Sequence, residues 1–491
     1  MSVSSFELKD FKQLIEEKVL FGNKLTPELF AILSVYFVQG ILGLARLAVS
    51  FFLKDDLGLT PTEVAVLTGI SAIPWVIKPV FGFISDGVPI FGYRRRPYLI
   101  LSGFLGTVSW LALATVVDNR LTATIAILMT SLSVAISDVI VDSLVVIRTK
   151  EESLGQAGSL QSLCWGFSAI GSLITAYLSG WLLQHLSIST VFEITATFPL
   201  VVSAVAWLIA EEKVTNIDKN QSTESSSIVK SQVTQLWRAV KQKSIWLPTL
   251  FLFIWQATPT ADSAFFFFTT NELGFEPEFL GRVRLVTSIA SLIGIFIFQK
   301  FLKEVPFRQI LGWSTVIAAA LGMTTLLLVT HANRALGIDD HLFSLGDSLI
   351  LTVMGQITWL PVLILSARLC PKGIEATLFA LLTSVWNLSM LLSHEFGALL
   401  THLLGITETN FDNLWLLVII TNLSTLLPLP FIGWLPKEDP QSLVHETTNE
   451  RMLSPAEAVP HHLAGSVIES SMIPDLVPEF VINQSASEEK K

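Results

Sequence analysis

The apolar run from Leu121 to Ile147 carries two carboxylates, Asp138 and Asp142. A helix of about 20 apolar residues crosses the hydrocarbon core of a bilayer, so this run is long enough to span a membrane. Residues four positions apart lie on one face of a helix, and the two aspartates therefore share an environment. An aspartate exposed to lipid at the bilayer centre costs about 2.5–3.5 kcal/mol. We therefore expect both to face a protein interior or a water-filled cavity, and two acids in such a place indicate a transport pathway.

The rest of the chain has the composition of a membrane protein. It has 491 residues, of which 51% are hydrophobic and 15% charged, and its mean hydropathy is +0.61. These values predict an all-α polytopic membrane protein. Twelve candidate transmembrane spans can be assigned, at residues 29–53, 64–84, 99–117, 121–147, 157–183, 188–210, 245–270, 280–302, 308–330, 342–367, 374–403 and 411–435.

The basic residues predict the orientation and the domain organisation. Lys and Arg gather in the loops on one side, which places both termini in the cytoplasm by the positive-inside rule. The predicted parts are an N-terminal segment (1–28), a six-helix half (29–210), a cytoplasmic linker (211–244), a second six-helix half (245–435) and an acidic tail (436–491). The tail is rich in proline and acidic residues and is expected to be disordered. The polar N-terminal segment lacks the apolar run of a cleavable signal peptide, so none is expected.

The two halves carry similar sequences. Leu57-Gly58-Leu59-Thr60-Pro61 matches Leu273-Gly274-Phe275-Glu276-Pro277 at an offset of 216 residues, and the same offset aligns Arg46 with Asp262. A parallel repeat of six-helix halves is the plan of a major facilitator transporter. We therefore predict twelve transmembrane helices in two pseudo-symmetric six-helix halves.

In major facilitator proteins, which this plan resembles, the first helix of each three-helix unit lines the central cavity. The resemblance implies that spans one, four, seven and ten supply the residues that bind substrate or protons. These spans carry Arg46, Asp138, Asp142, Asp262 and Asp347. The alternative is a structural ion pair, with Arg46 bound to Asp262 across the halves. Lys78, Glu193 and the pair His394-Glu395 are weaker candidates for gating or helix packing.

The loop between spans two and three resembles the loop signature of major facilitator proteins. It runs from Gly82 through Asp86 and Gly92 to the basic cluster, with a longer spacing between Asp86 and Gly92 than is usual. We expect Asp86 to interact with a helix N-terminus of the other half, and the basic residues to hold the loop against anionic lipid. The predicted cytoplasmic gate comprises Asp86, Arg94, Arg95, Arg96, Arg148 and Arg368. The alternative is a basic loop that only sets the topology.

Three segments together resemble the folate–biopterin transporter family. They are Ser85 to Tyr98, Ser137 to Asp142 and Glu152 to Gln161. The resemblance covers all twelve spans and is closest to cyanobacterial members. It implies a transporter of folate, 5-formyltetrahydrofolate and related pterins in the cell inner (plasma) membrane rather than the chloroplast envelope. The expected partners are this substrate and the lipid bilayer, with no nucleic acid, and the protein is expected to be a monomer.

The residues can be compared with the chemistry of such a substrate. A pterin ring presents an N–H and an amino group side by side, which one carboxylate of Asp138, Asp142 or Asp262 can accept. Arg46 offers a bidentate fork for the glutamate carboxylates of a folate. Trp255, Trp359 and Trp386, or Phe265 to Phe268, can stack on the flat ring, although packing is the commoner role for an aromatic residue.

Other functions are less well supported by the sequence. No nucleotide-binding loop is recognisable, so a proton gradient acting through a buried carboxylate is the expected driving force. No cofactor or metal site is expected, because Cys164 and Cys370 lack metal or redox spacing. A carrier of an unrelated small solute stays open, and an intramembrane aspartyl protease is a remote alternative, since Leu345-Gly346-Asp347 lacks a glycine at Ser344 and a Tyr-Asp partner segment. The protein is therefore predicted to be a transporter and not an enzyme.

Overall fold

The computed structural model describes residues 20, 23–149, 159–213, 241–302, 305–368 and 375–436. Most of the predicted linker and the acidic tail lie outside this part of the chain. The described residues are helical and contain no β-strand. Ten of their helical segments are long and apolar enough to cross a membrane. The two other predicted spans are helical as well: α12 (Lys243–Gln256) with α13 (Asp262–Phe267), and α19 (Glu375–Leu403).

The first half consists of six helical spans, two of them interrupted. Span one consists of α2 (Pro27–Ile41), a short 3-10 turn and α3 (Ala45–Phe51). Span two is divided into α4 (Pro61–Ser71), α5 (Ile73–Val76) and α6 (Lys78–Gly87). The other four spans are α7 (Arg96–Thr115), α8 (Arg120–Thr149), α9 (Ser159–His185) and α10 (Ile188–Val205). Span two breaks because Pro74 and Pro79 lack an amide hydrogen and clash with the preceding turn. The second break places Lys78 at the start of α6.

The second half repeats this arrangement. After α12 and α13 follow α14 (Pro277–Ile297), α15 (Phe307–Gly322) with α16 (Thr325–Val329), the short α17 (Ala332–Ala335), α18 (Asp340–Arg368), α19, and α20 (Leu414–Ser424) with a final 3-10 segment (Leu429–Trp434). The break between α12 and α13 contains Pro259, which disfavours helix at the residue before it.

The predicted internal symmetry is confirmed at the ends of spans one and seven. Each ends in a π-helical turn, Phe52–Asp56 in the first half and Phe268–Glu272 in the second. A glycine with positive φ follows each turn, Gly58 at 61° and Gly274 at 67°. A proline then begins the next helix in both halves. The same local sequence therefore produces the same chain reversal twice.

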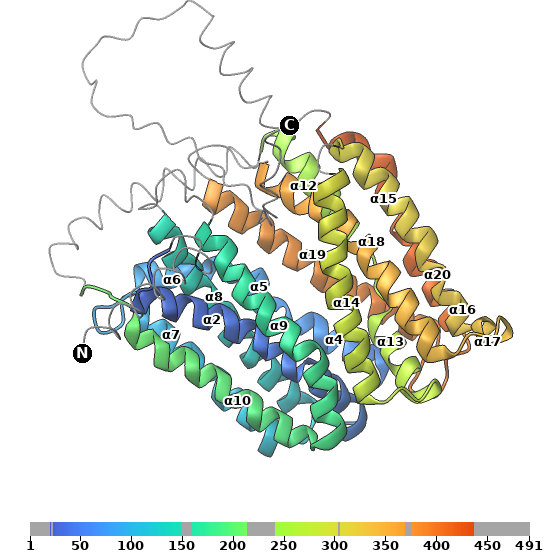
Figure 1. Ribbon diagram of the computed structural model, residues 1–491, viewed down its shortest axis with the longest axis horizontal. Helices are drawn as coiled ribbons and strands as arrows, with labels where there is room; N and C mark the ends of the chain where they lie inside the picture. The colour runs from blue at the N-terminus through green and yellow to red at the C-terminus, as the bar shows by residue number, and fades with distance from the viewer. Residues whose placement is uncertain are drawn as a thin grey trace, which may run out of the picture.

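The two halves form two helical bundles side by side (Figure 1). In the first bundle α2 packs on α9, and α7 packs on α8 and α10; in the second, α18 packs on α14 and α15. We call the end of the molecule with Arg94–Arg96 the inner end, and the end with the Gly58 and Gly274 turns the outer end. Between the bundles, α9 packs on α14 and α4 packs on α19, and the packing of span two on α19 weakens from α4 toward α6.

The bundles touch most closely at the outer end. A Cβ atom on Gly180 would lie 2.3 Å from the carbonyl oxygen of Pro277, and one on Gly281 would lie 2.9 Å from the carbonyl oxygen of Tyr177. Lys54 Nζ donates to Asn271 Oδ1 at 2.9 Å and Tyr177 Oη donates to Glu278 Oε1 at 3.2 Å. From this contact α9 and α14 diverge toward the inner end (Figure 1). The molecule is therefore closed at its outer end.

A valine at position 180 is expected to destabilise this contact. Its side chain would meet backbone atoms of α14, and overpacking of this kind costs about 1–3 kcal/mol. We expect a lower thermal unfolding temperature for the purified Gly180→Val protein in detergent. Gly166→Val is the matched control, because a Cβ on Gly166 of the same helix has no described heavy atom within 4 Å. Equal unfolding temperatures for the two variants would contradict the close approach.

Candidate functional site

Five side chains from three helices meet in the inner part of the first half. They are Tyr36 and Gln39 on α2, Lys78 on α6, and Asp138 and Asp142 on α8, and we call them the Lys78 cluster. Lys78 Nζ donates to Asp138 Oδ2 and, at 3.0 Å, to Asp142 Oδ2. The prediction that the two aspartates share an environment is confirmed, since one ammonium group binds both.

The remaining carboxylate oxygens also have donors. Tyr36 Oη donates to Asp142 Oδ1 at 2.5 Å, and Gln39 Nε2 donates to Asp138 Oδ1 at 3.2 Å. Buried charges are stable only when such bonds compensate for the lost water. The cluster nevertheless contains two carboxyl groups and only one cationic group, so the lysine can balance only one of them.

Asp142 is the more exposed of the two carboxylates. Asp138 is 9% exposed as a residue, whereas 42% of the Asp142 side chain is exposed. Lys78 Nζ also lies 5.7 Å from the ring centre of Trp75, and the Trp75 carbonyl accepts a bond of 3.1 Å from Asn387 Nδ2 on α19. The cluster therefore adjoins the contact between the halves, and Asp142 is its accessible carboxylate.

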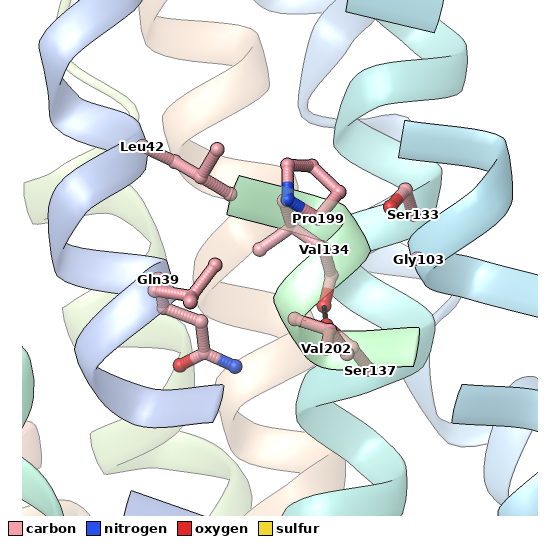
Figure 2. A pocket seen from close by; sticks show the side chains of 9 residues that line it. Gln39, Leu42, Gly103, Ser133, Val134, Ser137, Pro199 and Val202 are labelled. Atoms are coloured by element: carbon pink, nitrogen blue, oxygen red, sulfur yellow. Dashed lines mark hydrogen bonds between the residues drawn. The ribbon is translucent and has the colours of Figure 1, made fainter. Parts of the chain in front are cut away.

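A small cavity adjoins the cluster inside the first half. Figure 2 shows Gln39 together with Ser133, Ser137 and Pro199 around it. Its volume of about 10 Å³ is close to the space that one water molecule needs. Because Gln39 also donates to Asp138, a water here would belong to the polar surroundings of that carboxylate. An organic substrate does not fit in this cavity, so a substrate must be bound elsewhere.

A second polar layer lies nearer the outer end. Arg46 on α3 lies about 10 Å beyond Gln39 along span one, at 1.5 Å per residue. Asp262, at the start of α13, is exposed and lies near His394 on α19. Among the described residues no ion pair joins Arg46 to Asp262. The alternative in which this pair locks the halves together is therefore not realised in this conformation.

Asp347 lies apart from both layers. Its carboxylate accepts bonds from the hydroxyl groups of Thr324, at 2.5 Å, and Thr325, at 2.9 Å. These threonines lie at the beginning of α16, within the second half. The structure thus places Asp347 against span nine, where its donors are two neutral hydroxyl groups.

The predicted gate arginines that the structure describes bind the first half or residues that directly flank it. The amide groups of Arg94 and Arg96 donate to Glu211, at 2.6 and 3.0 Å, so that this carboxylate caps the start of α7. The Arg95 guanidinium donates to Ser143 Oγ, next to Asp142, and that of Arg96 to the Ile209 carbonyl. Arg148 donates to Thr26 Oγ1 at 2.9 Å. Asp86 lies in the last turn of α6 and Arg368 at the end of α18, but the side chains of both lie outside the described part.

The predicted aromatic residues divide into two groups. Trp359 and Trp386 contact each other with ring centres 3.8 Å apart, and both are half-buried. Phe267 and Phe268 are 0% and 1% exposed and belong to the hydrophobic core. Their role is packing, so they cannot stack on a ligand in this conformation, whereas the tryptophans retain exposed surface.

Several polar residues of these sites were not singled out from the sequence. Tyr36, Gln39, Arg284 and Glu211 carry polar groups that contact the sites, and Lys78 was only a weaker candidate. For Lys78 a signal was present, because a lysine before a proline inside an apolar span must find a counter-ion. Tyr36 and Gln39 lie three positions apart on span one, and only the packing of α2 against α8 brings them to the aspartates.

Two pseudo-symmetric bundles of membrane-spanning helices, with charged layers where they meet, define a transporter of the major facilitator fold. Solved structures of other proteins have the same fold. The D-xylose-proton symporter has a TM-score of 0.61 at 14% identity, covering 84% of this chain and 98% of its own. The nucleoside transporter NupG has a TM-score of 0.61 at 13% identity, covering 83% and 98%. At this identity the likeness concerns the fold.

The chain belongs to the BT1 family, whose model matches residues 39–455. It is 60% identical to a folate-biopterin transporter of Synechocystis sp. over 95% of both chains. It is 34% identical to the probable folate-biopterin transporter 2 of Arabidopsis thaliana, over 90% of this chain and 91% of that one. It is also 34% identical to folate transporter 2 of Plasmodium falciparum, over 87% and 91%. The protein is thus a multi-pass membrane transporter of a small molecule, and not an enzyme.

Proposed function

We propose that the protein transports folates and related pterins by alternating access between its two halves, coupled to proton movement. The names of its relatives support this substrate class, above all that of the Synechocystis protein, which is 60% identical over nearly the whole length. The observation that carries the mechanism is the Lys78 cluster, in which the carboxylate of Asp142 is 42% exposed and Lys78 lies beside Trp75, whose carbonyl binds Asn387 of the second half.

The chemistry of the cluster suits one end of such a substrate. A pterin presents an N–H and an amino group that one carboxylate can accept together. Asp142 accepts bonds from Lys78 and Tyr36, yet a carboxylate has about four acceptor sites and so retains capacity for a ligand. Trp359 and Trp386 in the second half offer half-buried ring surface. The proposed site therefore lies between Asp142 and the second half.

Proton coupling follows from the charge of the cluster. One lysine balances only one of the two aspartates. Burying an unbalanced carboxylate is costly, and one proton makes the cluster neutral. We propose that a proton binds together with the substrate while Asp142 is accessible. The cluster is then neutral while the transporter passes through the conformation in which the site is closed to both sides.

The inner-end residues are proposed to act as a gate rather than as a binding site. At 1.5 Å per residue Arg148 lies about 9 Å from Asp142 along α8. In the present conformation, closed at the outer end, Arg95 and Arg96 bind partners in the first half and Arg148 binds Thr26 just before it. We propose that the gate residues, with Asp86 and Arg368, form contacts between the halves when the inner end closes.

Asp86→Asn is accordingly expected to slow transport much more than it weakens equilibrium binding. A contact that forms in only one conformational state shifts the equilibrium between the inward-open and outward-open states by the free energy of that contact. Uptake rates and substrate binding to purified protein should be measured side by side. Asp118→Asn, at the exposed outer surface, is the matched control. A loss of binding above about a hundredfold, roughly 2.7 kcal/mol, would place Asp86 in the binding site and refute the gate.

We further propose that the protein is a monomer in the cell inner membrane with both termini in the cytoplasm. The basic residues of the inner end support this orientation, because positively charged loops stay on the cytoplasmic side. The domain organisation predicted from the sequence is part of the same proposal.

Uptake of labelled 5-formyltetrahydrofolate tests the proposed substrate. Cells that lack their own carrier should accumulate it when they express this protein. Absence of uptake of folates and of pterins, with the protein present in the membrane, would instead favour a carrier of an unrelated solute.

A further inference from the structure

Two arginines from opposite halves approach each other near the outer end. Arg46 comes from α3 and Arg284 from α14, and both lie within membrane-spanning segments. Arg284 Nη1 donates to Ser179 Oγ on α9 at 3.3 Å. A Cβ on Gly43 would lie 3.0 Å from Thr175 Oγ1, one turn before Ser179. Spans one and five run in the same direction, so Arg46, three residues after Gly43, lies at about the same height in the membrane as Ser179, four residues after Thr175. Arg46 is therefore close enough to Arg284 for the two positive charges to repel each other.

Neither arginine has an ion-pair partner among the residues that the structure describes. Arg46 is exposed and Arg284 is half-buried. A charge exposed to lipid is costly, so we expect both arginines to face the polar space between the halves. Two guanidinium groups that repel each other in a partly buried place are stabilised by an anion between them. Carboxylates suit this role, because the planar guanidinium group donates two parallel hydrogen bonds to them.

The charges of the two layers are complementary to an elongated ligand. The Lys78 cluster carries an excess of carboxylate, and the arginines lie about 10 Å further toward the outer end. A ligand with hydrogen-bond donors at one end and carboxylates at the other has one favourable orientation between these layers. A folate has this polarity, with its pterin ring at one end and its glutamate at the other.

We propose that Arg46 and Arg284 form a carboxylate-binding site between the halves, which binds the glutamate end of a folate while the pterin end lies at Asp142. This proposal rests on the proposed function. Since each half supplies one arginine, a carboxylate bound to both also links the halves at their outer end. Arg284 thereby becomes a specificity residue that selects folates over pterins without a glutamate.

The test compares three probes on purified protein: 5-formyltetrahydrofolate, biopterin, which has no carboxylate, and p-aminobenzoylglutamate, which has no pterin. In Arg284→Gln and Arg46→Gln we expect binding of both carboxylate probes to weaken by about thirtyfold, or about 2 kcal/mol. Biopterin binding should stay unchanged, which also shows that the variants are folded. Arg284→Lys should retain part of the affinity for the carboxylates. Arg282→Gln is the matched control, since Arg282 on the same helix is exposed and paired with Glu278.

The outcomes separate this proposal from the proposed function. If the wild-type protein binds none of the probes, the proposed function fails and the carboxylate site fails with it. If it binds them and the Gln variants lose biopterin and folate equally, or lose neither, only the carboxylate site is refuted. Where a Gln variant does not fold, the Lys variant decides, because a partial loss of p-aminobenzoylglutamate binding with unchanged biopterin binding supports the site, and an equal loss of both or a loss of neither refutes it.

Discussion

Replacing Asp142 with Asn is expected to abolish accumulation of 5-formyltetrahydrofolate while the protein stays in the membrane. The substitution keeps the shape of the side chain but removes its charge and its ability to take up a proton. Lys78 then balances Asp138 alone, so the cluster becomes neutral without a proton. We expect uptake to fall by about a hundredfold or more, as when an interaction needed in the transport step is removed. Asp138→Asn should have a similar effect, because it frees Lys78 to neutralise Asp142.

The measurement is the initial rate of labelled uptake, normalised to the amount of protein in the membrane. Asp339→Asn is a suitable control, because its side chain is 71% exposed in a loop at the outer end. Uptake within about twofold of wild type for both single variants, a difference below about 0.5 kcal/mol, would remove the two aspartates from the mechanism.

The second large effect is expected at Lys78. Lys78→Met leaves two partly buried carboxylates without their cation, and breaking a buried ion pair costs about 3–5 kcal/mol. The amount of folded protein should therefore fall strongly. The double variant Lys78→Met with Asp138→Asn removes one charge of each sign and should recover most of the folded protein, without recovering transport.

Fluorescence-detected size-exclusion chromatography of the solubilised variants measures this recovery. Arg120→Met serves as the control, because the ion pair of Arg120 with Glu63 lies at the surface, where such pairs contribute about 0–1 kcal/mol. Losses of folded protein that simply add in the double variant would show that Lys78 and Asp138 are not coupled.

The fold could be predicted from the sequence because its determinants are local. Apolar runs of sufficient length mark the spans, and the repeated Leu-Gly-X-X-Pro segments produce the same turn in both halves. The spacing of Asp138 and Asp142 places them on one face of α8 whatever surrounds that helix.

The partners of the charged residues could not be predicted because they depend on how distant helices pack. Lys78 reaches both aspartates only because span two breaks before Pro79 and turns toward α8. The offset that aligns Arg46 with Asp262 reflects the repeat and not a contact, and it is Arg284 that lies near Arg46. Phe265 to Phe268 are apolar in a span, and the sequence does not indicate which of them the core buries.

Transport by purified protein in liposomes tests the central claim most directly. Proteoliposomes with wild-type protein should accumulate labelled 5-formyltetrahydrofolate when the pH gradient drives protons inward, and accumulation should stop when an ionophore collapses that gradient. The Asp142→Asn protein should accumulate none under either condition. Equal accumulation by the two proteins, or wild-type uptake that does not respond to the gradient, would contradict a proton-coupled folate transporter that works through the Lys78 cluster.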